Sequence, residues 1–511
     1  MLQIKNLTIT HKKDAKIILE NFHCVLNNGD KAVIIGEEGN GKSTLLRWIY
    51  DPAQISAYCE SSGKRIDQGQ KMGYLPQELP RGDSEKSLYD YFMEETAFFD
   101  HTPKELGKIA AQFGLPADFF YREQRMGTLS GGEKVKAQLL RLVLAQPDIL
   151  LLDEPSNDID LETLGWLEQF LLDWKKIVLY ISHDETLMEH TANIVIHLER
   201  VRKKTRVRCQ VARMPYLQYK TERAGRFDKQ AQKAAAERRE KKLRDEKYQK
   251  VYQSVDHAQR VISRQNPAGG RLLKKKMHAV KSMERRFARA DACMTQMPEE
   301  ETAIYFQLGA KTDAVANGKT VLDYELDTLY TPDQKRILSK NIRLVVRGSQ
   351  KVCIIGTNGT GKTTLLHQIA SSLLKRSDIH AAYMPQNYEE LLDLSQTPVD
   401  FLDQTGDQAR RTRIRTYLHA MKYTEDEINH TAAELSGGQK AKLLLLQMSL
   451  SGANVLILDE PTRNFSPLSA PVIRQMLKTF PGAIISVSHD RKYMDEVCDT
   501  VCRLTKDGIV Y

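Results

Sequence analysis

The chain has 511 residues, 41% of them hydrophobic, and a formal net charge of +9. This length predicts two or three domains, and the absence of any run of about 20 apolar residues argues against a membrane-spanning segment. The start, MLQIKNLTIT, does not resemble a signal peptide, and the seven cysteines are dispersed without CxxC pairs. We therefore expect a cytoplasmic protein with reduced thiols.

The first chemical motif along the chain is a glycine-rich loop between an apolar stretch, KAVII, and a helical one. It reads GEEGNGKST, a phosphate-binding loop in the strand–loop–helix context that this motif requires. Lys42 is placed for the β- and γ-phosphates and Ser43 for Mg²⁺. We predict ATP and Mg²⁺ as ligands, with ATP contacts from the whole loop: Gly36, Glu37, Glu38, Gly39, Asn40, Gly41, Lys42, Ser43 and Thr44.

Acidic and polar candidates follow the next predicted strands. Gln77 ends the segment YLPQ and is a candidate ligand of ATP and of Mg²⁺. The apolar run ILLLDE predicts a buried strand that ends in Asp153, a Mg²⁺ ligand, and Glu154, which can orient or deprotonate the attacking water. A helix cap is the structural alternative for this acidic pair. His183, after the strand-like KIVLYIS, is a further catalytic candidate that can reach the γ-phosphate.

The segment LSGGEK, residues 129–134, resembles the signature motif of ATP-binding cassette (ABC) proteins. In that family the serine and backbone N–H groups at a helix start contact the γ-phosphate that the opposite domain holds. The resemblance implies ATP contacts from Ser130, Gly131 and Gly132.

All five motifs recur in the same order in the second half of the chain, which predicts a tandem repeat of two α/β domains. The second phosphate loop reads GTNGTGKTT, and its predicted ATP contacts are Gly356, Thr357, Asn358, Gly359, Thr360, Gly361, Lys362, Thr363 and Thr364. The other ATP candidates of this copy are Gln386, Ser436, Gly437 and Gly438; the Mg²⁺ candidates are Thr363, Gln386 and Asp459; and the catalytic candidates are Glu460 and His489.

The ABC resemblance further implies that the two domains pair head to tail within one monomer. Ser130 and Gly132 would then complete the site built on Lys362, and Ser436 and Gly438 the site built on Lys42. His11 and Tyr330 are candidates for stacking on adenine, and packing at a strand end is an equally good interpretation of each.

A basic helical segment separates the two copies. Residues 201–300 hold 28 Lys and Arg against 11 Asp and Glu, an excess of 17, so the rest of the chain carries a net charge of −8. Apolar residues recur every three or four positions on both sides of a turn-like SRQNPAGG: Tyr248, Val251, Tyr252, Val255, Ala258 and Ile262 before it, and Leu273, Met277, Val280, Met283 and Phe287 after it. We predict an antiparallel helical hairpin with facing apolar seams that binds a polyanion. A solvated coiled-coil face is the alternative.

Two cassettes joined by such a hairpin resemble the ABC-F family of translation factors. The fold class is accordingly α/β, with two ABC-type nucleotide-binding domains at residues 1–207 and 301–511 joined by a hairpin linker at 208–300. In that family the hairpin is the P-site tRNA interaction motif, here with its tip at about 263–271. The resemblance implies contacts with 23S rRNA and P-site tRNA of the 70S ribosome, and no membrane or DNA partner. The candidate contacts are Arg264, Gln265, Asn266, Arg271, Leu272, Leu273, Lys274, Lys275 and Lys276.

The loop after Glu460 reads PTRNFSP and is similar to that of the antibiotic-resistance branch of ABC-F, whereas the first copy reads PSNDID. Ser466 therefore stands where Asp160 stands in the first copy, which puts equal hydrolysis at the two sites in doubt. This branch implies an ATPase that enters the ribosomal exit site and protects the ribosome by drug displacement. The alternatives are a housekeeping translation or ribosome-assembly factor and, in another class, the ATPase subunit of a drug transporter.

Overall fold

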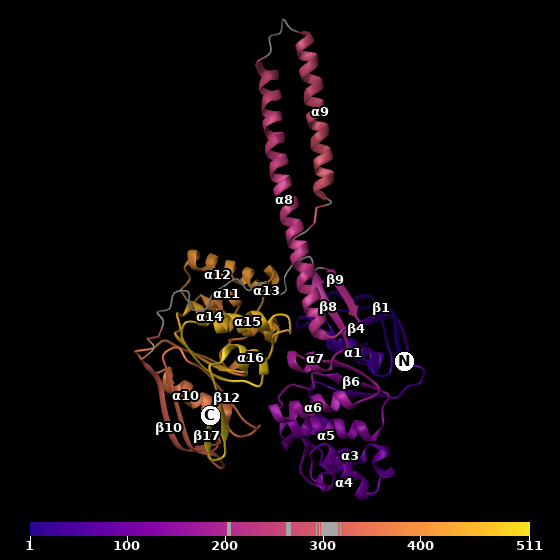
Figure 1. Ribbon diagram of the computed structural model, residues 1–511, viewed down its shortest axis with the longest axis vertical. Coiled ribbons are helices and arrows are strands. Elements are labelled where there is room, and N and C mark those ends of the chain that lie inside the picture. The colour runs from indigo at the N-terminus through magenta and orange to yellow at the C-terminus, as the bar shows by residue number, and fades with distance from the viewer. Residues whose placement is uncertain are drawn as a thin grey trace. The chain divides into compact units, whose positions relative to one another are not determined.

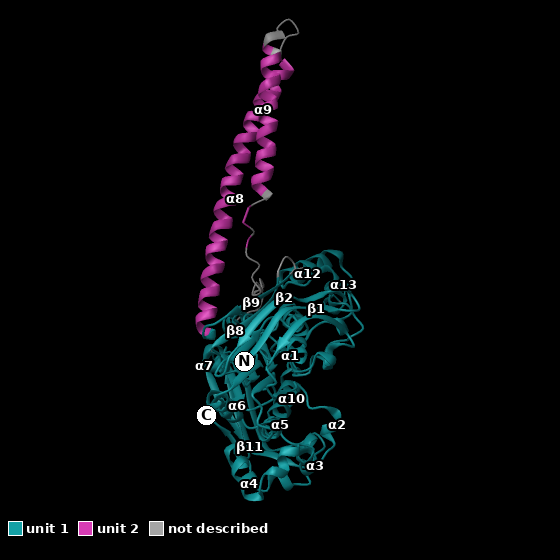
Figure 2. Cartoon of the chain, turned by 90° about the vertical axis from the view of Figure 1, so that its right-hand side faces the viewer, with its two compact units in different colours: residues 1–216, 301–511 teal, residues 217–300 magenta. Residues whose placement is uncertain are grey.

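The computed structural model describes residues 1–201, 206–261, 267–292, 294–295, 297, 315–316, 318–403 and 405–511. The chain forms two compact units, which Figure 2 shows in different colours. The first comprises Met1–Tyr216 and Glu301–Tyr511, and the second Leu217–Glu300. No helix in the described part of the chain is long and apolar enough to cross a bilayer.

The first repeat is built on a six-stranded sheet with the strand order β5-β6-β7-β3-β8-β9, parallel except for β9. These strands are β3 Lys31–Ile35, β5 Met72–Leu75, β6 Ile149–Asp153, β7 Ile177–Ile181, β8 Ile194–Val201 and β9 Arg206–Ala212. A second, antiparallel sheet contains β1 Leu2–His11, β2 Ile17–Leu26 and β4 Cys59–Ile66. The helices are α1 Lys42–Tyr50, α2 Arg81–Ser84, α3 Leu88–Met93, α4 Pro103–Gln112, α5 Gly131–Leu144, α6 Leu161–Asp173 and α7 Glu185–Thr191.

The second repeat has the same strand order, β13-β14-β15-β12-β16-β17, again with an antiparallel last strand. Its strands are β10 Thr320–Tyr330, β11 Ile337–Arg347, β12 Lys351–Ile355, β13 Ala381–Met384, β14 Val455–Asp459, β15 Ala483–Val487, β16 Thr500–Thr505 and β17 Gly508–Val510. Its helices are α10 Lys362–Leu373, α11 Pro398–Leu402, α12 Gln408–Ala420, α13 Glu425–Asn429, α14 Gly437–Leu450, α15 Ala470–Lys478 and α16 Arg491–Val497. The predicted α/β class with two repeated domains is confirmed.

The central strands explain why the two acidic motifs are held firmly. Every residue of β6 and of β14 is buried, as expected for parallel strands covered on both faces. Each strand ends on an aspartate, and the glutamate that follows has a left-handed φ of 54° or 52°. Each glutamate therefore leaves the sheet through a turn. Such a conformation is uncommon outside glycine and is typical of functional sites.

The second unit is a pair of antiparallel helices, α8 Tyr216–Val261 and α9 Pro267–Ala292, that run side by side (Figure 1). Tyr248 meets Phe287 edge to face at 6.0 Å between ring centroids, and Val280 is buried in the seam. The predicted hairpin is present, but two of its predicted seam residues are misplaced: Val251 is 48% exposed and Met283 is 47% exposed. Tyr248 contacts Tyr252, four residues later, at 6.1 Å between ring centroids, whereas Val251, three residues later, faces solvent.

The boundaries differ from those expected at 207/208. Strand β9 pairs with β8 as far as Ala212, so the first sheet continues past residue 207.

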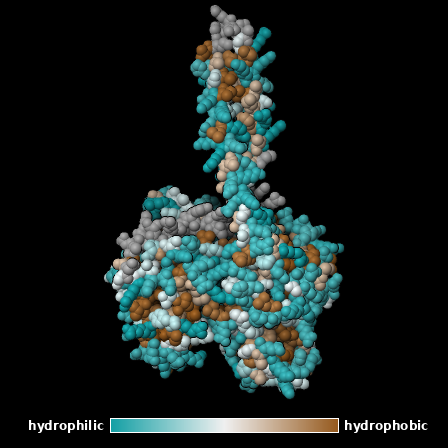
Figure 3. Space-filling view, viewed as in Figure 1, coloured by the Kyte–Doolittle hydropathy of each residue, from teal (hydrophilic) through white to brown (hydrophobic). Residues whose placement is uncertain are grey.

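The cysteines in the described part of the chain are free thiols: Cys24, Cys59, Cys209, Cys353, Cys498 and Cys502. Cys293 lies outside the described residues. Figure 3 shows the hairpin surface as largely hydrophilic with separate apolar patches.

Candidate ATP-binding sites

Both phosphate loops hold their lysine in the same way. Lys42 Nζ donates to the carbonyls of Gly36 at 2.9 Å and Glu37 at 3.2 Å, and Lys362 Nζ to those of Gly356 at 2.8 Å and Thr357 at 3.1 Å. Gly36 and Gly41 adopt positive φ of 150° and 87°. A Cβ on Gly36 would lie 2.4 Å from the carbonyl oxygen of Leu198, so the loop needs glycine there.

A hydroxyl and a carboxylate meet at the end of β6. Ser43 Oγ donates to Asp153 Oδ1 at 3.0 Å, and the Tyr74 hydroxyl donates to Asp153 Oδ2 at 3.3 Å. Burial raises the pKa of Asp153 to about 6, and the nearby Glu154 charge adds to this effect. A cation beside Asp153 would relieve that cost of holding a buried charge.

The neighbouring Glu154 has the opposite electrostatic character. Burial by itself would raise its pKa, but the His183 hydrogen bond and the charges of His183 and Lys42 outweigh it and lower the pKa to about 2. His183 Nε2 lies 3.2 Å from Glu154 Oε1, and Gln77 Nε2 donates to Glu154 Oε2 at 3.0 Å. Asn157 also donates to Oε2. Glu154 is therefore ionised and held from several sides at neutral pH.

In the second repeat, burial dominates the acidic pair. Both carboxylate oxygens of Asp459 are buried without a hydrogen-bond partner among the described residues. Burial raises the pKa of Asp459 to about 6, against the opposing influence of the Thr363 side chain and Lys362. Burial, reinforced by the charge of Asp459, raises the pKa of Glu460 to about 8.

The histidine of the second repeat does not counteract the raised pKa of Glu460. His489 Nε2 stands 3.8 Å from Glu460 Oε1, too far for a hydrogen bond, and the Ser488 hydroxyl and the His489 backbone N–H donate to Glu460 Oε2 at 3.3 Å each. Burial and the Lys362 charge lower the pKa of His489 to about 4. At neutral pH Glu460 is therefore mostly protonated, and His489 is uncharged.

The oxygen-rich pairs at the two strand ends suit Mg²⁺. Ser43 with Asp153, and Thr363 with the unpartnered Asp459, are hard oxygen donors of the kind that Mg²⁺ prefers. No group of three or more His, Cys, Asp or Glu among the described residues forms a self-sufficient metal site. This fits an ion that takes its remaining ligands from phosphates and water.

The signature helices start with capping boxes and face the other repeat. Ser130 and Ser436 accept from the N–H groups of Glu133 at 3.3 Å and Gln439 at 3.4 Å. Across the repeats, Gly438 N–H donates to Glu38 Oε2 at 2.7 Å. The first signature lines a cavity of about 1470 Å³ together with the second phosphate loop and all four catalytic candidates. The lining includes Ser130, Gly131, Gly132, Asn358, Lys362, Thr363, Glu154, Glu460, His183 and His489.

Further contacts across the repeats escaped the sequence analysis. Asn358 N–H donates to Asp160 Oδ2 at 3.3 Å, and its side-chain amide donates to the Asp158 carbonyl at 2.7 Å. Arg463 pairs with the Asp158 carboxylate at 2.8 Å. Gln386 Nε2 also lies 3.5 Å from Asp158 Oδ1, and the role of Gln386 as a Mg²⁺ ligand stays a prediction. The signal in the sequence that could have indicated these contacts was the acidic Asp158 in the first loop and the basic Arg463 in the corresponding loop of the second repeat.

His183 links the repeats as well. Its Nδ1 lies 2.9 Å from the carbonyl oxygen of Phe465, within PTRNFSP. Ser466 in that loop accepts from Ser469 N–H at 3.2 Å, just as Asp160 accepts from Thr163 N–H at 2.9 Å. The two loops are thus capped alike, although only one carries a carboxylate.

The residues predicted to stack on adenine and those predicted to contact RNA at the hairpin tip are only partly placed by the structure. His11 Nδ1 pairs with Asp14 at 2.8 Å at the end of β1, and Tyr330 ends β10 with 44% exposure; stacking on adenine stays a prediction for both. Arg264, Gln265 and Asn266 lie outside the described residues. The remaining tip candidates, Arg271, Leu272, Leu273, Lys274, Lys275 and Lys276, lie in the first turns of α9, and all except Leu273 are exposed.

Comparisons with known proteins agree with a fold of two nucleotide-binding domains. A family profile described as ABC transporter matches residues 19–157 and 339–463, more than half of the chain. The whole chain is 26% identical to the ribosome protection protein VmlR of Bacillus subtilis (strain 168), covering 88% of it. Over 97% of its length it is 25% identical to ABC transporter F family member 4 of Arabidopsis thaliana, covering 72%. Among solved structures, the archaeal ribosome recycling factor aABCE1, in complex with the stalk protein aP1, matches 99% of this chain and 89% of its own with a TM-score of 0.57; at 15% identity the likeness concerns the fold.

Proposed function

The chain belongs to the ABC transporter family and is an ATPase with two tandem nucleotide-binding domains, and from this premise we propose that it is an ABC-F protein that acts on the ribosome. The observation that carries the proposal is the basic hairpin between two intact domains. Residues 201–300 have an excess of 17 positive charges, and α9 displays Lys274, Lys275 and Lys276 on its exposed first turns. Such a surface gains affinity for RNA through phosphate contacts and counterion release.

We propose the resistance branch as the finer assignment: ATP-bound protein enters the exit site of the 70S ribosome, acts on P-site tRNA and the peptidyl-transferase centre, and displaces a bound antibiotic. The likeness to VmlR over the whole chain supports it, as does the PTRNFSP loop. The candidate contacts with 23S rRNA and tRNA are those at the hairpin tip, and the protein would act as a cytoplasmic monomer.

In the ATPase cycle, we assign Lys42 and Lys362 to the phosphates of the two ATP molecules. Mg²⁺ would be held by Ser43 with Asp153 and by Thr363 with Asp459, and it would neutralise phosphate charge during hydrolysis. Glu154 and Glu460 orient the attacking water, and each signature helix completes the site of the opposite repeat. The contact between Gly438 N–H and Glu38 supports this crossed arrangement.

The test is co-sedimentation of a Glu154→Gln, Glu460→Gln double variant with purified 70S ribosomes. With ATP we expect the variant to pellet with the ribosomes, because the ATP-bound state persists when hydrolysis stops. The matched control adds Lys42→Ala and Lys362→Ala, which should release it. Fractionation with membranes and not with ribosomes would instead favour the ATPase subunit of a transporter.

The resistance role needs a separate test, because a housekeeping translation or ribosome-assembly factor is the second candidate. Replacing Lys274, Lys275 and Lys276 by Gln in an expressing strain should restore susceptibility to drugs of the peptidyl-transferase centre, such as pleuromutilins or lincosamides. The control is the same triple change at the exposed Lys229, Lys242 and Lys247 of α8. If deletion slows growth without drug and susceptibility never changes, the housekeeping function is the correct one.

A further inference from the structure

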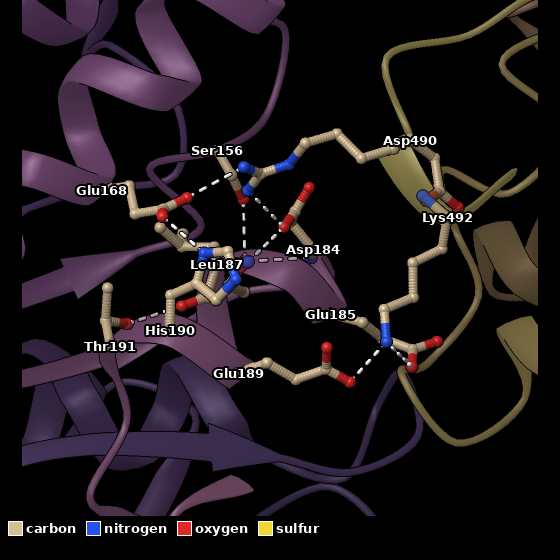
Figure 4. Close-up of polar contacts among 12 residues, drawn as sticks. Ser156, Glu168, Asp184, Glu185, Leu187, Glu189, His190, Thr191, Asp490 and Lys492 are labelled. Atoms are coloured by element: carbon tan, nitrogen blue, oxygen red, sulfur yellow. Dashed lines mark hydrogen bonds and ion pairs between the residues drawn. The ribbon is translucent and has the colours of Figure 1, made fainter. Parts of the chain in front are cut away.

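A cluster of ion pairs joins the two repeats where α7 meets α16 (Figure 4). The two helices occupy equivalent positions in the repeat, after SHD in both cases, yet their first residues are oppositely charged. Helix α7 begins with Glu185, whereas α16 begins with Arg491 and Lys492. Equivalent helices that carry opposite charges can pair with one another, which identical helices could not do.

The more accessible part of this cluster ties α16 to α6 and α7. Arg491 donates to Glu168 at 2.9 Å and to Asp184 at 3.2 Å. Lys492 pairs with Glu189 and lies 3.8 Å from Glu185. Figure 4 shows Lys492 of the second repeat reaching toward Glu185 and Glu189 of the first.

The interior part is centred on Arg474 of α15, which is only 1% exposed. Its guanidinium pairs with Glu185 of the first repeat at 2.9 Å and, within its own repeat, with Glu496 at 2.8 Å and Asp490 at 3.8 Å. A buried cation shared among three carboxylates has a planar, multiply bonded geometry that lysine cannot reproduce. Removing one partner of a buried pair leaves the other uncompensated, and this fixes the arrangement strongly.

Two carboxylates in this cluster directly follow the two catalytic histidine candidates. Asp184 follows His183 and caps α7 by accepting from Leu187 N–H, and Asp490 follows His489 and caps α16 by accepting from Tyr493 N–H at 3.1 Å. Arg491 therefore hydrogen-bonds the cap beside His183, and Arg474 forms a longer ion pair, at 3.8 Å, with the cap beside His489. A shift of either histidine segment must move cations that also contact the other repeat.

We propose that Arg474 and Arg491 are positioning residues that join the two histidine segments, so that ATP hydrolysis at one site depends on the nucleotide state of the other. The inference rests on the ATPase activity and the site assignment, and not on the ribosomal role. Coupling is carried by a contiguous set of ion pairs with discrete partners, a form that can transmit a change between sites.

The experiment measures phosphate release by the ribosome-free protein. First-site hydrolysis is compared in two backgrounds: Glu460→Gln, in which the second site binds ATP without hydrolysing it, and Lys362→Ala, in which it does not bind ATP. The ratio of the two rates is the coupling factor, which we expect to be about 5 or more, the lower end of typical coupling between sites. A ratio of 1 would overturn the proposal at once.

Arg474→Met and Arg491→Met should each bring the coupling factor close to 1, and Arg474→Lys should restore it only in part. The matched control is Arg343→Met, which removes an exposed Arg–Glu pair at 3.0 Å between β10 and β11 and should leave the factor unchanged. A merely structural role would lower both rates together and keep their ratio. If Arg474→Met fails to fold, Arg491→Met decides.

Charge exchange provides the rescue. Lys492→Glu should lower the coupling factor, and adding Glu189→Lys should raise it again, because the pair re-forms with its charges reversed. The side chains of Lys492 and Glu189 are 22% and 16% exposed, so the exchanged charges keep some access to water. A double exchange that leaves the factor at the value of Lys492→Glu alone contradicts the proposal.

Discussion

The two ATP sites share their motifs and backbone yet differ in charge. In the first, Glu154 is ionised, with a pKa of about 2, because hydrogen bonding and nearby positive charge outweigh its burial. In the second, burial and Asp459 raise the pKa of Glu460 to about 8, and its histidine stands 3.8 Å away. The side chains around the same motif thus set the pKa of its glutamate, and with it the fraction that is ionised at neutral pH. We infer that the sites hydrolyse ATP unequally at neutral pH.

The largest expected effect separates the two glutamates. Glu154→Gln should lower steady-state ATP hydrolysis at pH 7 about 100-fold, the low end of what a general base contributes, whereas Glu460→Gln should lower it only a few-fold. Phosphate release under saturating ATP measures both, with the exposed Glu60→Gln as control. Equal losses in the two variants would show that the difference in carboxylate charge has no catalytic consequence.

The pH dependence sharpens the same comparison. In Glu154→Gln only the second site works, and about a tenth of its Glu460 is ionised at pH 7 when the pKa is about 8. Its rate should therefore rise about tenfold as pH increases from 7 to 9, because the ionised carboxylate is the active form. The Glu460→Gln variant should lack this rise, since Glu154 is ionised throughout the range. A flat profile in Glu154→Gln contradicts the assignment of Glu460.

The sequence was sufficient to predict the two repeats, the strand–loop–helix context of Lys42 and Lys362, and the meeting of Ser43 with Asp153. These features follow from local pattern and from the fact that parallel strands end at one edge of a sheet. The lowered pKa of the buried Glu154 was not predictable, because it depends on His183 and Lys42, which reach the carboxylate from other parts of the chain. Arg474 gave no signal either, since an arginine in an amphipathic helix is ordinarily solvated.

The hairpin shows the same limit on a smaller scale. Spacing alone placed Val251 and Met283 in the seam, but the facing helix decides which neighbouring positions are covered. The two phosphate loops also differ at one position whose role could not be predicted from the sequence. Glu38 of the first copy aligns with Asn358 of the second, and only the structure shows that each reaches into the opposite repeat.

The difference between Glu38 and Asn358 predicts an effect of intermediate size on ATP binding. Glu38 accepts from Gly438 N–H at 2.7 Å, the helix start assigned to the γ-phosphate, and its negative charge opposes an incoming phosphate. Glu38→Asn, which copies Asn358, should tighten ATP binding at the first site about fivefold, as one charge-assisted hydrogen bond no longer competes. Titration with a fluorescent ATP analogue in a Lys362→Ala background measures it, and Glu37→Gln is the neighbouring control. Unchanged or weaker binding would show that Glu38 does not compete with the nucleotide.

The smallest effect concerns the loops in which Asp160 and Ser466 correspond. Both side chains accept an N–H three residues later, and aspartate and serine are nearly equivalent caps. Asp160→Ser keeps this cap and loses the 3.3 Å contact with Asn358 N–H, so it should change the free energy of unfolding by no more than about 1 kcal/mol, as measured by thermal or denaturant unfolding. The reverse change, Ser466→Asp, should cost more, because Ser466 is only 5% exposed and a carboxylate there loses its hydration. If the two exchanges lower the free energy of unfolding equally, burial does not explain why the second loop has serine and not aspartate. The difference between the two sites must then be explained by their catalytic groups alone.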